Sequence, residues 1–313
     1  MKHILIIQTR PGIGDLCIFL SSMHQIAKKH PNSKITLITK KRSKADEILK
    51  DDNHINDIIF LDSNIYKNKK NFISNFIKLK NFIKEENFTK VFIMHYGIRY
   101  KLICKLAGVK EIFSYPILKK NENISQKIYN ETKKWLNLNS FNRNAVININ
   151  KSSNEEYNKK KIIIGIGSSG PTRRWNKEKF INVINFLNKK DNFKFLLAAG
   201  KNEELEANNI ISNLSKKIDI ETMCDDTISQ TLKKIKDSYF YFGTDSAFMH
   251  LSAALNVKSF ALFGDTPTNY AEYSESIFPI IPENYKNIGH NSNAMHLIND
   301  NYVCSILDKY LNK

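Results

Sequence analysis

The sequence of 313 residues has few glycines, prolines and cysteines and no long apolar run. Its 11 glycines and 7 prolines are about half the usual share, which excludes collagen-like, linker-dominated and low-complexity chains. No apolar stretch approaches the roughly 18 residues that a membrane-spanning helix needs. The N-terminal apolar run, Ile4 to Ile7, is too short for a signal peptide.

The four cysteines lie far apart and form no CxxC pair. Neither a disulfide framework nor a zinc cluster is therefore expected. Reduced thiols are typical of a cytoplasmic protein. Localisation in the cytoplasm is the corresponding prediction.

Positive charge is abundant: 48 Lys and Arg against 31 Asp and Glu give a net charge of +17. Such a balance raises nucleic acid, an anionic membrane and phosphorylated substrates as partners. The basic residues are dispersed, and the richness in Lys, Asn and Ile is also typical of AT-rich coding sequences, so the charge is either functional or compositional. No basic cluster adjoins a nucleic-acid motif, and nucleic acid is not expected as a partner.

The chain alternates short apolar strands with amphipathic helices. Because helices of 10–15 residues separate the strands, parallel sheets built from βαβ units are predicted. A polar segment over 150–160 separates two such series. We predict an α/β fold with two Rossmann-like domains, over 1–155 and 156–313, whose parallel sheets face an interdomain cleft. The helix at 297–311 closes the second domain or packs back on the first.

Residues 70–86 form a basic amphipathic helix. It either covers the first sheet or lies on a membrane surface. The apolar stripe favours the sheet-covering helix, with six side chains facing inward: Phe72, Ile73, Phe76, Ile77, Leu79 and Ile83.

Ligands of parallel sheets bind beyond the carboxyl ends of the strands. The first such loop reads QTRPGIGD, in which Gly12 and Gly14 permit a tight turn. Asp15 follows where a helix begins. It can cap that helix and can also serve as a general base, since the two roles are not exclusive and negative charge is favourable near a helix N-terminus.

The second domain opens with IIIGIGSSGPTRRW. Its glycines match GxGxxG formally, but Pro171 follows at once and no acid ends the second strand, so a nicotinamide or flavin site is not favoured. Hydroxyls and guanidinium groups instead suit a phosphate cradle. The candidates are Ser168, Ser169, Arg173 and Arg174.

The segment FGTDSAFMHLSAALNVKSFALFGDTP (242–267) combines a strand, a turn and a helix. The first-turn amides at Ser246 and Ala247 offer an anion site. His250 lies one helical turn after Ser246. Gly264 to Pro267 form a second polar loop after the next strand, and the two loops together favour a nucleotide-diphosphate pocket.

These segments resemble glycosyltransferase family 9, the heptosyltransferases, whose usual signature is D-T-G-x-x-H, a small-residue helix and A-L-F-G-P-T. The opening ILIIQTRPGIGD and PNSKITLIT also resemble that family. The resemblance implies a GT-B enzyme that transfers a sugar with inversion from a nucleotide diphosphate in lipopolysaccharide core assembly. It implies no metal and no cofactor besides the nucleotide sugar.

The resemblance also implies a role for each matching position. Asp15 would be the catalytic base, and Arg173 would neutralise the leaving diphosphate. Glu203 would contact the donor nucleoside and Asp245 the donor sugar. Backbone amides at Ser246 and Ala247, together with His250, would hold the phosphates.

Several positions depart from the family pattern. Ala247 stands where the family has Gly, Asp265 where it has Pro after Phe-Gly, and Asn176 where it has Pro after Arg-Trp. Because of these departures, the resemblance does not specify the identity of the donor sugar.

The prediction is a heptosyltransferase that uses ADP-heptose. Its acceptor would be an anionic, lipid-linked lipopolysaccharide or lipooligosaccharide core at the cytoplasmic face of the inner membrane, where the enzyme is a peripheral protein. Three alternatives stay open: transfer of another nucleotide sugar to capsule or O-chain, a noncatalytic nucleotide-sugar or nucleic-acid binder, and an NAD-dependent oxidoreductase.

Overall fold

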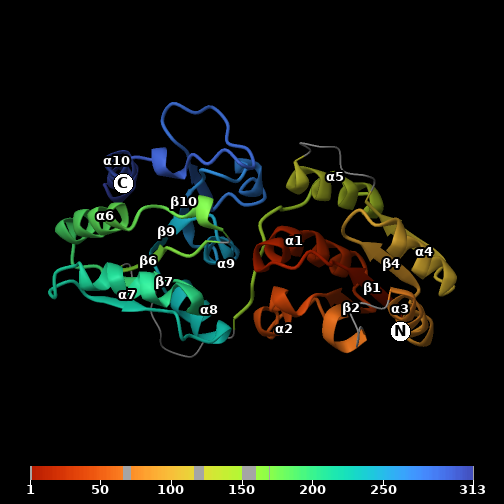
Figure 1. Ribbon diagram of the computed structural model, residues 1–313. Helices are drawn as coiled ribbons and strands as arrows, with labels where there is room; N and C mark the ends of the chain where they lie inside the picture. Colours follow the sequence, from red (N-terminus) through yellow and green to blue (C-terminus); the bar gives the residue numbers. More distant parts are fainter. Residues whose placement is uncertain (1, 66–71, 116–122, 150–159, 169, 313) are drawn as a thin grey trace. The chain divides into compact units, whose positions relative to one another are not determined.

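The computed structural model describes residues 2–65, 72–115, 123–149, 160–168 and 170–312. The chain divides into two compact units, Met1–Ile149 and Asn150–Lys313 (Figure 1). Each unit contains one parallel sheet with helices packed on it.

The sheet of the first unit has the strand order β3-β2-β1-β4-β5, and every pairing is parallel. Its strands are β1 (Lys2–Ile7), β2 (Ser33–Thr39), β3 (Asp57–Phe60), β4 (Lys90–Ile93) and β5 (Glu111–Ser114). Its helices are α1 (Ile13–Lys29), α2 (Ala45–Ile48), α3 (Phe72–Glu85), α4 (Ile98–Leu106) and α5 (Ile124–Leu136). The order reverses at β1, so the loop that follows β1 lies at a switch point of the sheet, where ligands of such folds bind.

The apolar runs of the first sheet are buried on both faces. In β1, Leu5 and Ile7 pack in a cluster with residues of α3 and α4. Ile4 and Ile6 are equally buried and point to the opposite face, because side chains alternate along a strand. This double burial explains why the strand reads as one continuous apolar run.

The sheet of the second unit has the order β11-β10-β9-β6-β7-β8 and is also parallel. Its strands are β6 (Lys161–Gly165), β7 (Lys194–Ala198), β8 (Ile220–Thr222), β9 (Phe240–Thr244), β10 (Lys258–Leu262) and β11 (Ile277–Ile280). Its helices are α6 (Lys177–Lys190), α7 (Glu204–Ser212), α8 (Ile228–Lys236), α9 (Ala247–Ala254) and α10 (Asp300–Leu311). A 3₁₀ turn, η3 (Pro171–Arg173), follows β6.

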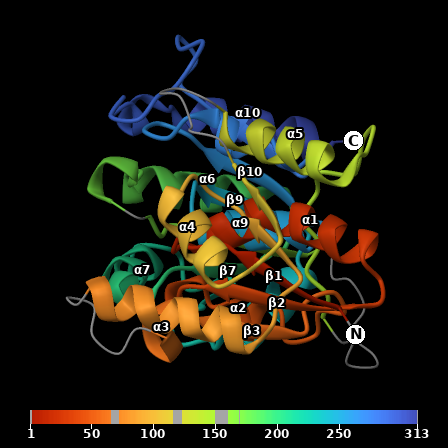
Figure 2. The same cartoon turned by 90° about the vertical axis from the view of Figure 1, so that its right-hand side faces the viewer.

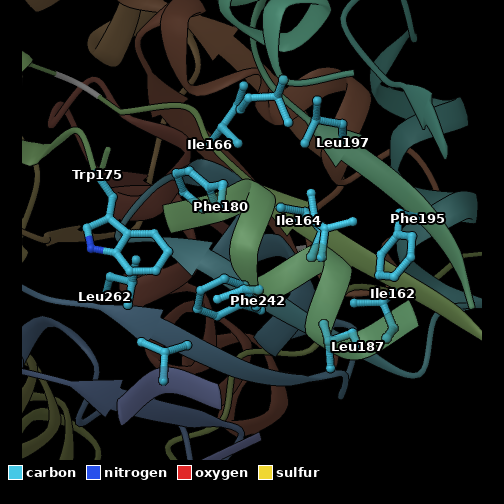
Figure 3. Close-up of a cluster of buried hydrophobic side chains, with 14 of the residues drawn as sticks. Ile162, Ile164, Ile166, Trp175, Phe180, Leu187, Phe195, Leu197, Phe242 and Leu262 are labelled. Carbon is cyan, nitrogen blue, oxygen red and sulfur yellow. The ribbon is translucent and has the colours of Figure 1, made fainter. Parts of the chain in front are cut away.

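An aromatic core holds the second unit together (Figure 3). Trp175 lies edge-on to Phe180 and to Phe242, with ring centroids 4.9 and 5.9 Å apart. The Trp175 Nε1 donates a hydrogen bond to the Ile298 carbonyl at 3.1 Å, which satisfies its only polar group. This anchoring fixes the chain immediately after the loop that follows β6.

The predicted fold class, two Rossmann-like α/β units each with a parallel sheet, is confirmed. Residues 150–159 of the expected linker lie outside the described residues. The C-terminal helix α10 packs on α6, and its Val303 and Leu307 belong to the core of the second unit. The helices α4 and α5 and the strands β5 and β11 were not predicted.

The helix over 70–86 is α3, and it covers the sheet of the first unit as expected, with Leu79 and Ile83 buried. The prediction that Ile73 and Ile77 face inward was wrong, because both side chains are exposed. At about 100° per residue these two positions lie well to one side of the stripe formed by Phe76, Leu79 and Ile83. The side chain of Phe72 lies outside the described residues.

The four cysteines are free thiols. Within the described ranges no helix is long and apolar enough to cross a membrane.

Candidate functional site

In the first unit, the chain leaves β1 through residues 8–12 and enters α1 at Ile13. Gly12, not Asp15, is the N-cap of this helix, so the interpretation of Asp15 as the cap was wrong. Asp15 lies in the first turn, and its Oδ2 accepts a hydrogen bond from the Gly12 amide at 3.2 Å. A Cβ at position 12 would lie 3.1 Å from that oxygen, so glycine gives the carboxylate room.

Arg10 is the second partner of Asp15. Its Nε donates to Asp15 Oδ1 at 2.5 Å, and the Asp15 side chain keeps 19% of its surface exposed. A carboxylate has about four lone-pair positions. With two of them used, the group is oriented by the chain and can still accept a proton from a bound molecule.

His95 lies at the same edge of the sheet and was missed by the sequence analysis. Its Nδ1–H donates to the Tyr96 carbonyl, so its Nε2 accepts from the Thr9 hydroxyl at 2.5 Å. Burial lowers the pKa of His95, and the positive charges of Arg10 and Lys40 lower it further. The ring is therefore neutral at pH 7 and ties the loop after β4 to the loop after β1. A histidine two residues beyond a buried strand was the only signal for it.

In the second unit, a set of hydrogen bonds connects loops that follow four different strands. The Glu203 carboxylate joins the loops after β6 and β7, since Oε1 accepts from the Ser168 amide at 2.9 Å and Oε2 from the Gly200 amide at 2.8 Å. The Thr244 hydroxyl at the end of β9 donates to the Gly167 carbonyl. These contacts bring Ser168 and Glu203 together.

The loop after β10 is connected to the same group. Asp265 is buried, and its Oδ2 accepts from the Thr172 hydroxyl at 2.6 Å while its Oδ1 accepts from the Asn293 amide at 2.7 Å. Burial alone would raise the pKa of Asp265, but these hydrogen bonds and the positive charge of Arg173 hold it below its usual value. Asp265 therefore fixes the turn that carries Arg173.

The two adjacent arginines lie in different surroundings. Arg173 closes the 3₁₀ turn and is half-buried near the Asp265 carboxylate. Arg174 is exposed, and its guanidinium lies 3.6 Å from Glu206 on α7. The structure thus brings Arg173 to the connected loops and directs Arg174 away from them. Ser169 lies outside the described residues.

The segment after β9 places Asp245 and His250 together. His250 Nε2 lies 3.8 Å from Asp245 Oδ1, and both side chains are buried. The Tyr273 hydroxyl lies 2.8 Å from His250 Nδ1, and its ring stacks on the imidazole. Tyr273, which the sequence analysis missed, orients the histidine from a position 23 residues away.

The N-terminus of α9 can bind an anion. Ser246 is its N-cap but makes no side-chain cap hydrogen bond. The Ser246 hydroxyl instead lies 3.3 Å from the hydroxyl of the buried Tyr241. First-turn amides without a side-chain cap, at the positive end of the helix dipole, are suited to phosphate groups. Ala247 is half-buried at this position.

Two glycines allow the neighbouring strands β6 and β9 to approach each other closely. A Cβ at Gly165 would lie 2.0 Å from the Tyr241 hydroxyl, and one at Gly243 would lie 2.1 Å from the Gly165 carbonyl. The GxGxxG match has no dinucleotide-type helix, because α6 begins at Lys177, seven positions after Gly170. No group of three or more His, Cys, Asp or Glu side chains in the described part of the chain could hold a metal ion.

Solved structures with a similar fold include two glycosyltransferases. A family 9 glycosyl transferase from Veillonella parvula has a TM-score of 0.78 at 17% identity, covering 99% of this chain and 97% of that one. ADP-heptose lps heptosyltransferase II of E. coli has a TM-score of 0.75 at 16% identity, covering 99% and 98%.

Sequence comparisons define the family. The model of glycosyltransferase family 9 (heptosyltransferase) matches residues 110–299, and the chain belongs to this family. Lipooligosaccharide heptosyltransferase 2 of Campylobacter jejuni is 35% identical over 120 residues, which is 36% of this chain and 36% of that protein. The match therefore spans about a third of the curated relative.

Proposed function

We propose that this protein is an inverting heptosyltransferase that transfers heptose from ADP-heptose to a lipooligosaccharide or lipopolysaccharide core. The observation that supports the proposal best is the set of connected loops at the N-terminus of α9, which lies within the region matched by the family model. The two relatives named for heptose transfer support the choice of sugar.

The second unit takes the donor in this proposal. The diphosphate binds the first-turn amides of α9 at Ser246 and Ala247. Arg173 balances the charge that develops as the nucleoside diphosphate leaves. Asp245 contacts the sugar hydroxyls and Glu203 the nucleoside. His250, held by Tyr273, supports the phosphate end of the pocket, as do Ser168 and Ser169.

Asp15 is the general base in this proposal. It takes the proton from an acceptor hydroxyl while that oxygen forms a bond to the anomeric carbon of the donor. The bond from that carbon to the diphosphate oxygen breaks, and the nucleoside diphosphate departs with the electron pair. Attack from the side opposite the leaving group inverts the anomeric configuration.

Because Arg173 and the dipole of α9 supply positive charge at the diphosphate, the reaction proceeds without an added divalent metal. EDTA is expected to leave the transfer rate unchanged. A rate that falls with EDTA and recovers with added metal would contradict this part of the proposal.

The first unit takes the acceptor, whose lipid anchor holds it at the cytoplasmic face of the inner membrane. Gly12 and Gly14 place the loop after β1 close to the acceptor. The net charge of +17 suits an anionic acceptor.

A second candidate is transfer of another nucleotide sugar to capsule or O-chain glycan. Two departures from the family signature favour it: Asp265, which holds Thr172 and Asn293, and Ala247, whose methyl group lies at the anion site. Calorimetric titration with ADP-heptose, ADP-glucose, GDP-mannose and UDP-glucose separates the candidates. We expect ADP-heptose to bind tightest, and tighter binding of a GDP- or UDP-sugar would overturn the assignment of the donor.

A further inference from the structure

The outer face of α4 has an apolar stripe that the core does not use. Ile98, Leu102 and Leu106 follow one another at four-residue spacing, with 68%, 47% and 56% of their surfaces exposed. The inner face of the same helix, with Ile103 and Cys104, is packed in the core of the first unit. The outer residues therefore add nothing to the packing of the sheet.

Positive charge adjoins this stripe. Lys101 and Lys105 are exposed and lie about 100° from Leu102 and Leu106 around the helix. The sequence of α4, IRYKLICKL, also contains Arg99 and has no acidic residue. We use "α4 outer face" for Ile98, Leu102 and Leu106 with Lys101 and Lys105.

The neighbouring helix, α3, also exposes apolar side chains. α3 packs beside α4, as both views show (Figures 1 and 2), and exposes Ile73 and Ile77. Five of the eleven large apolar side chains that are exposed in the described part of the chain lie on these two helices. Such a concentration marks an interaction surface, whereas isolated exposed apolar residues do not.

We infer that the α4 outer face docks on an anionic lipid bilayer. Apolar side chains that insert between headgroups, with lysines beside them to pair with lipid phosphates, are what a peripheral membrane surface requires. A second copy of the chain fits less well, because a two-fold interface would bring the same lysines of both copies together.

The position of the α4 outer face also suits an enzyme whose acceptor is held in a membrane. This inference rests on the proposed transfer to a lipid-linked acceptor. α4 begins just beyond His95, which is hydrogen-bonded to Thr9 in the loop that leads to Asp15. A pocket of about 720 Å³ is lined by Tyr96, Ile98 and Lys101, together with residues of β5 and α5. A bilayer on α4 would thus hold the glycan of the acceptor at the edge of the sheet that carries Asp15.

The test is sedimentation of the full chain with vesicles, without donor or acceptor. We expect binding to vesicles of equal parts phosphatidylcholine and phosphatidylglycerol, and little binding to phosphatidylcholine alone. Leu102→Ser is expected to lower the partition coefficient by about tenfold. Lys101→Gln with Lys105→Gln is expected to lower it by roughly 25-fold, since each lysine near an anionic surface contributes about fivefold.

The matched controls are Val146→Ser, whose side chain is 50% exposed in the first unit, and Lys216→Gln with Lys217→Gln in the second. The inference would be overturned if the control variants lose as much vesicle binding as the α4 variants. It would also be overturned if the wild-type chain does not bind anionic vesicles. A loss of self-association in Leu102→Ser, measured by sedimentation velocity, without any vesicle binding by the wild type would overturn it as well. ADP-heptose titration of the same variants is a separate readout, so failure of vesicle binding is distinguishable from failure of the proposed transferase.

Discussion

At the scale of single residues, the proposed chemistry depends on how neighbours hold two charged side chains. Asp15 is oriented by Arg10 and by the Gly12 amide, and Arg173 lies on a turn that Asp265 holds. Asp15 thereby keeps part of its hydrogen-bonding capacity for a bound molecule. Substitutions of these two side chains therefore test the proposed chemistry directly.

Asp15→Asn tests the base. The amide can still accept from Gly12 but cannot take a proton at neutral pH, so we predict a loss of about 10² to 10⁴ in kcat. Donor affinity, measured by calorimetry, stays unchanged because the residue lies in the other unit. A kcat within about threefold of wild type would show that another group accepts the proton.

Arg173→Ala and Arg174→Ala form a matched pair. Loss of Arg173 removes a charged hydrogen-bond donor worth about 1.5 to 3 kcal/mol, which is roughly a ten- to hundredfold weaker Kd for ADP-heptose. Arg174 contacts Glu206 at 3.6 Å on the exposed surface, so its loss is expected to change Kd by less than about threefold. Equal effects of the two substitutions would show that the structure does not separate their roles.

At the scale of secondary-structure elements, the parallel strands could be predicted from the sequence because buried strands read as apolar runs. β5 was missed because EIFS contains only two apolar residues, and α4 was missed because it has apolar side chains on both its inner and its outer face. The connections between loops could not be predicted, because they join distant positions. Thr172 and Asp265 are 93 residues apart, and no local pattern reports such a contact.

Gly165→Ala tests the close approach of β6 and β9. The new methyl would overlap the buried Tyr241 hydroxyl, which donates to the Thr244 carbonyl at 2.7 Å. We predict a destabilisation of about 1 to 3 kcal/mol in denaturant unfolding. Gly170→Ala is the control, because a Cβ there meets nothing within 4 Å. Equal stability of Gly165→Ala and wild type would contradict the packing described for these strands.

Asp265→Asn tests the link between the loops after β6 and β10. The folded-state pKa of Asp265 lies below its usual 3.8, so its contribution to stability is present above that pH and is lost as the pH falls through the folded-state value. We predict that wild type exceeds the variant in Tm at pH 7 and that this difference shrinks below about pH 4. A difference that is independent of pH would mean that the charge of Asp265 plays no part.

At the scale of the whole molecule, the chain joins two parallel-sheet units, and its polar strand-end loops gather at the carboxyl edge of each sheet. The sequence indicated this organisation, and the family match agrees with it. The net charge of +17 could not be assigned from composition, because its lysines are spread along the chain. The structure places two of them, Lys101 and Lys105, beside an exposed apolar stripe, and the inferred membrane docking assigns a role to this part of the charge.

The most direct test of the account is a transfer assay with the purified chain, ADP-heptose and a heptose-deficient lipooligosaccharide core in anionic vesicles. Mass spectrometry of the glycolipid and detection of released ADP follow the reaction, with Asp15→Asn as the inactive control. We predict the addition of one heptose with stoichiometric release of ADP by the wild type. No transfer from ADP-heptose, together with transfer from a GDP- or UDP-sugar under the same conditions, would contradict it.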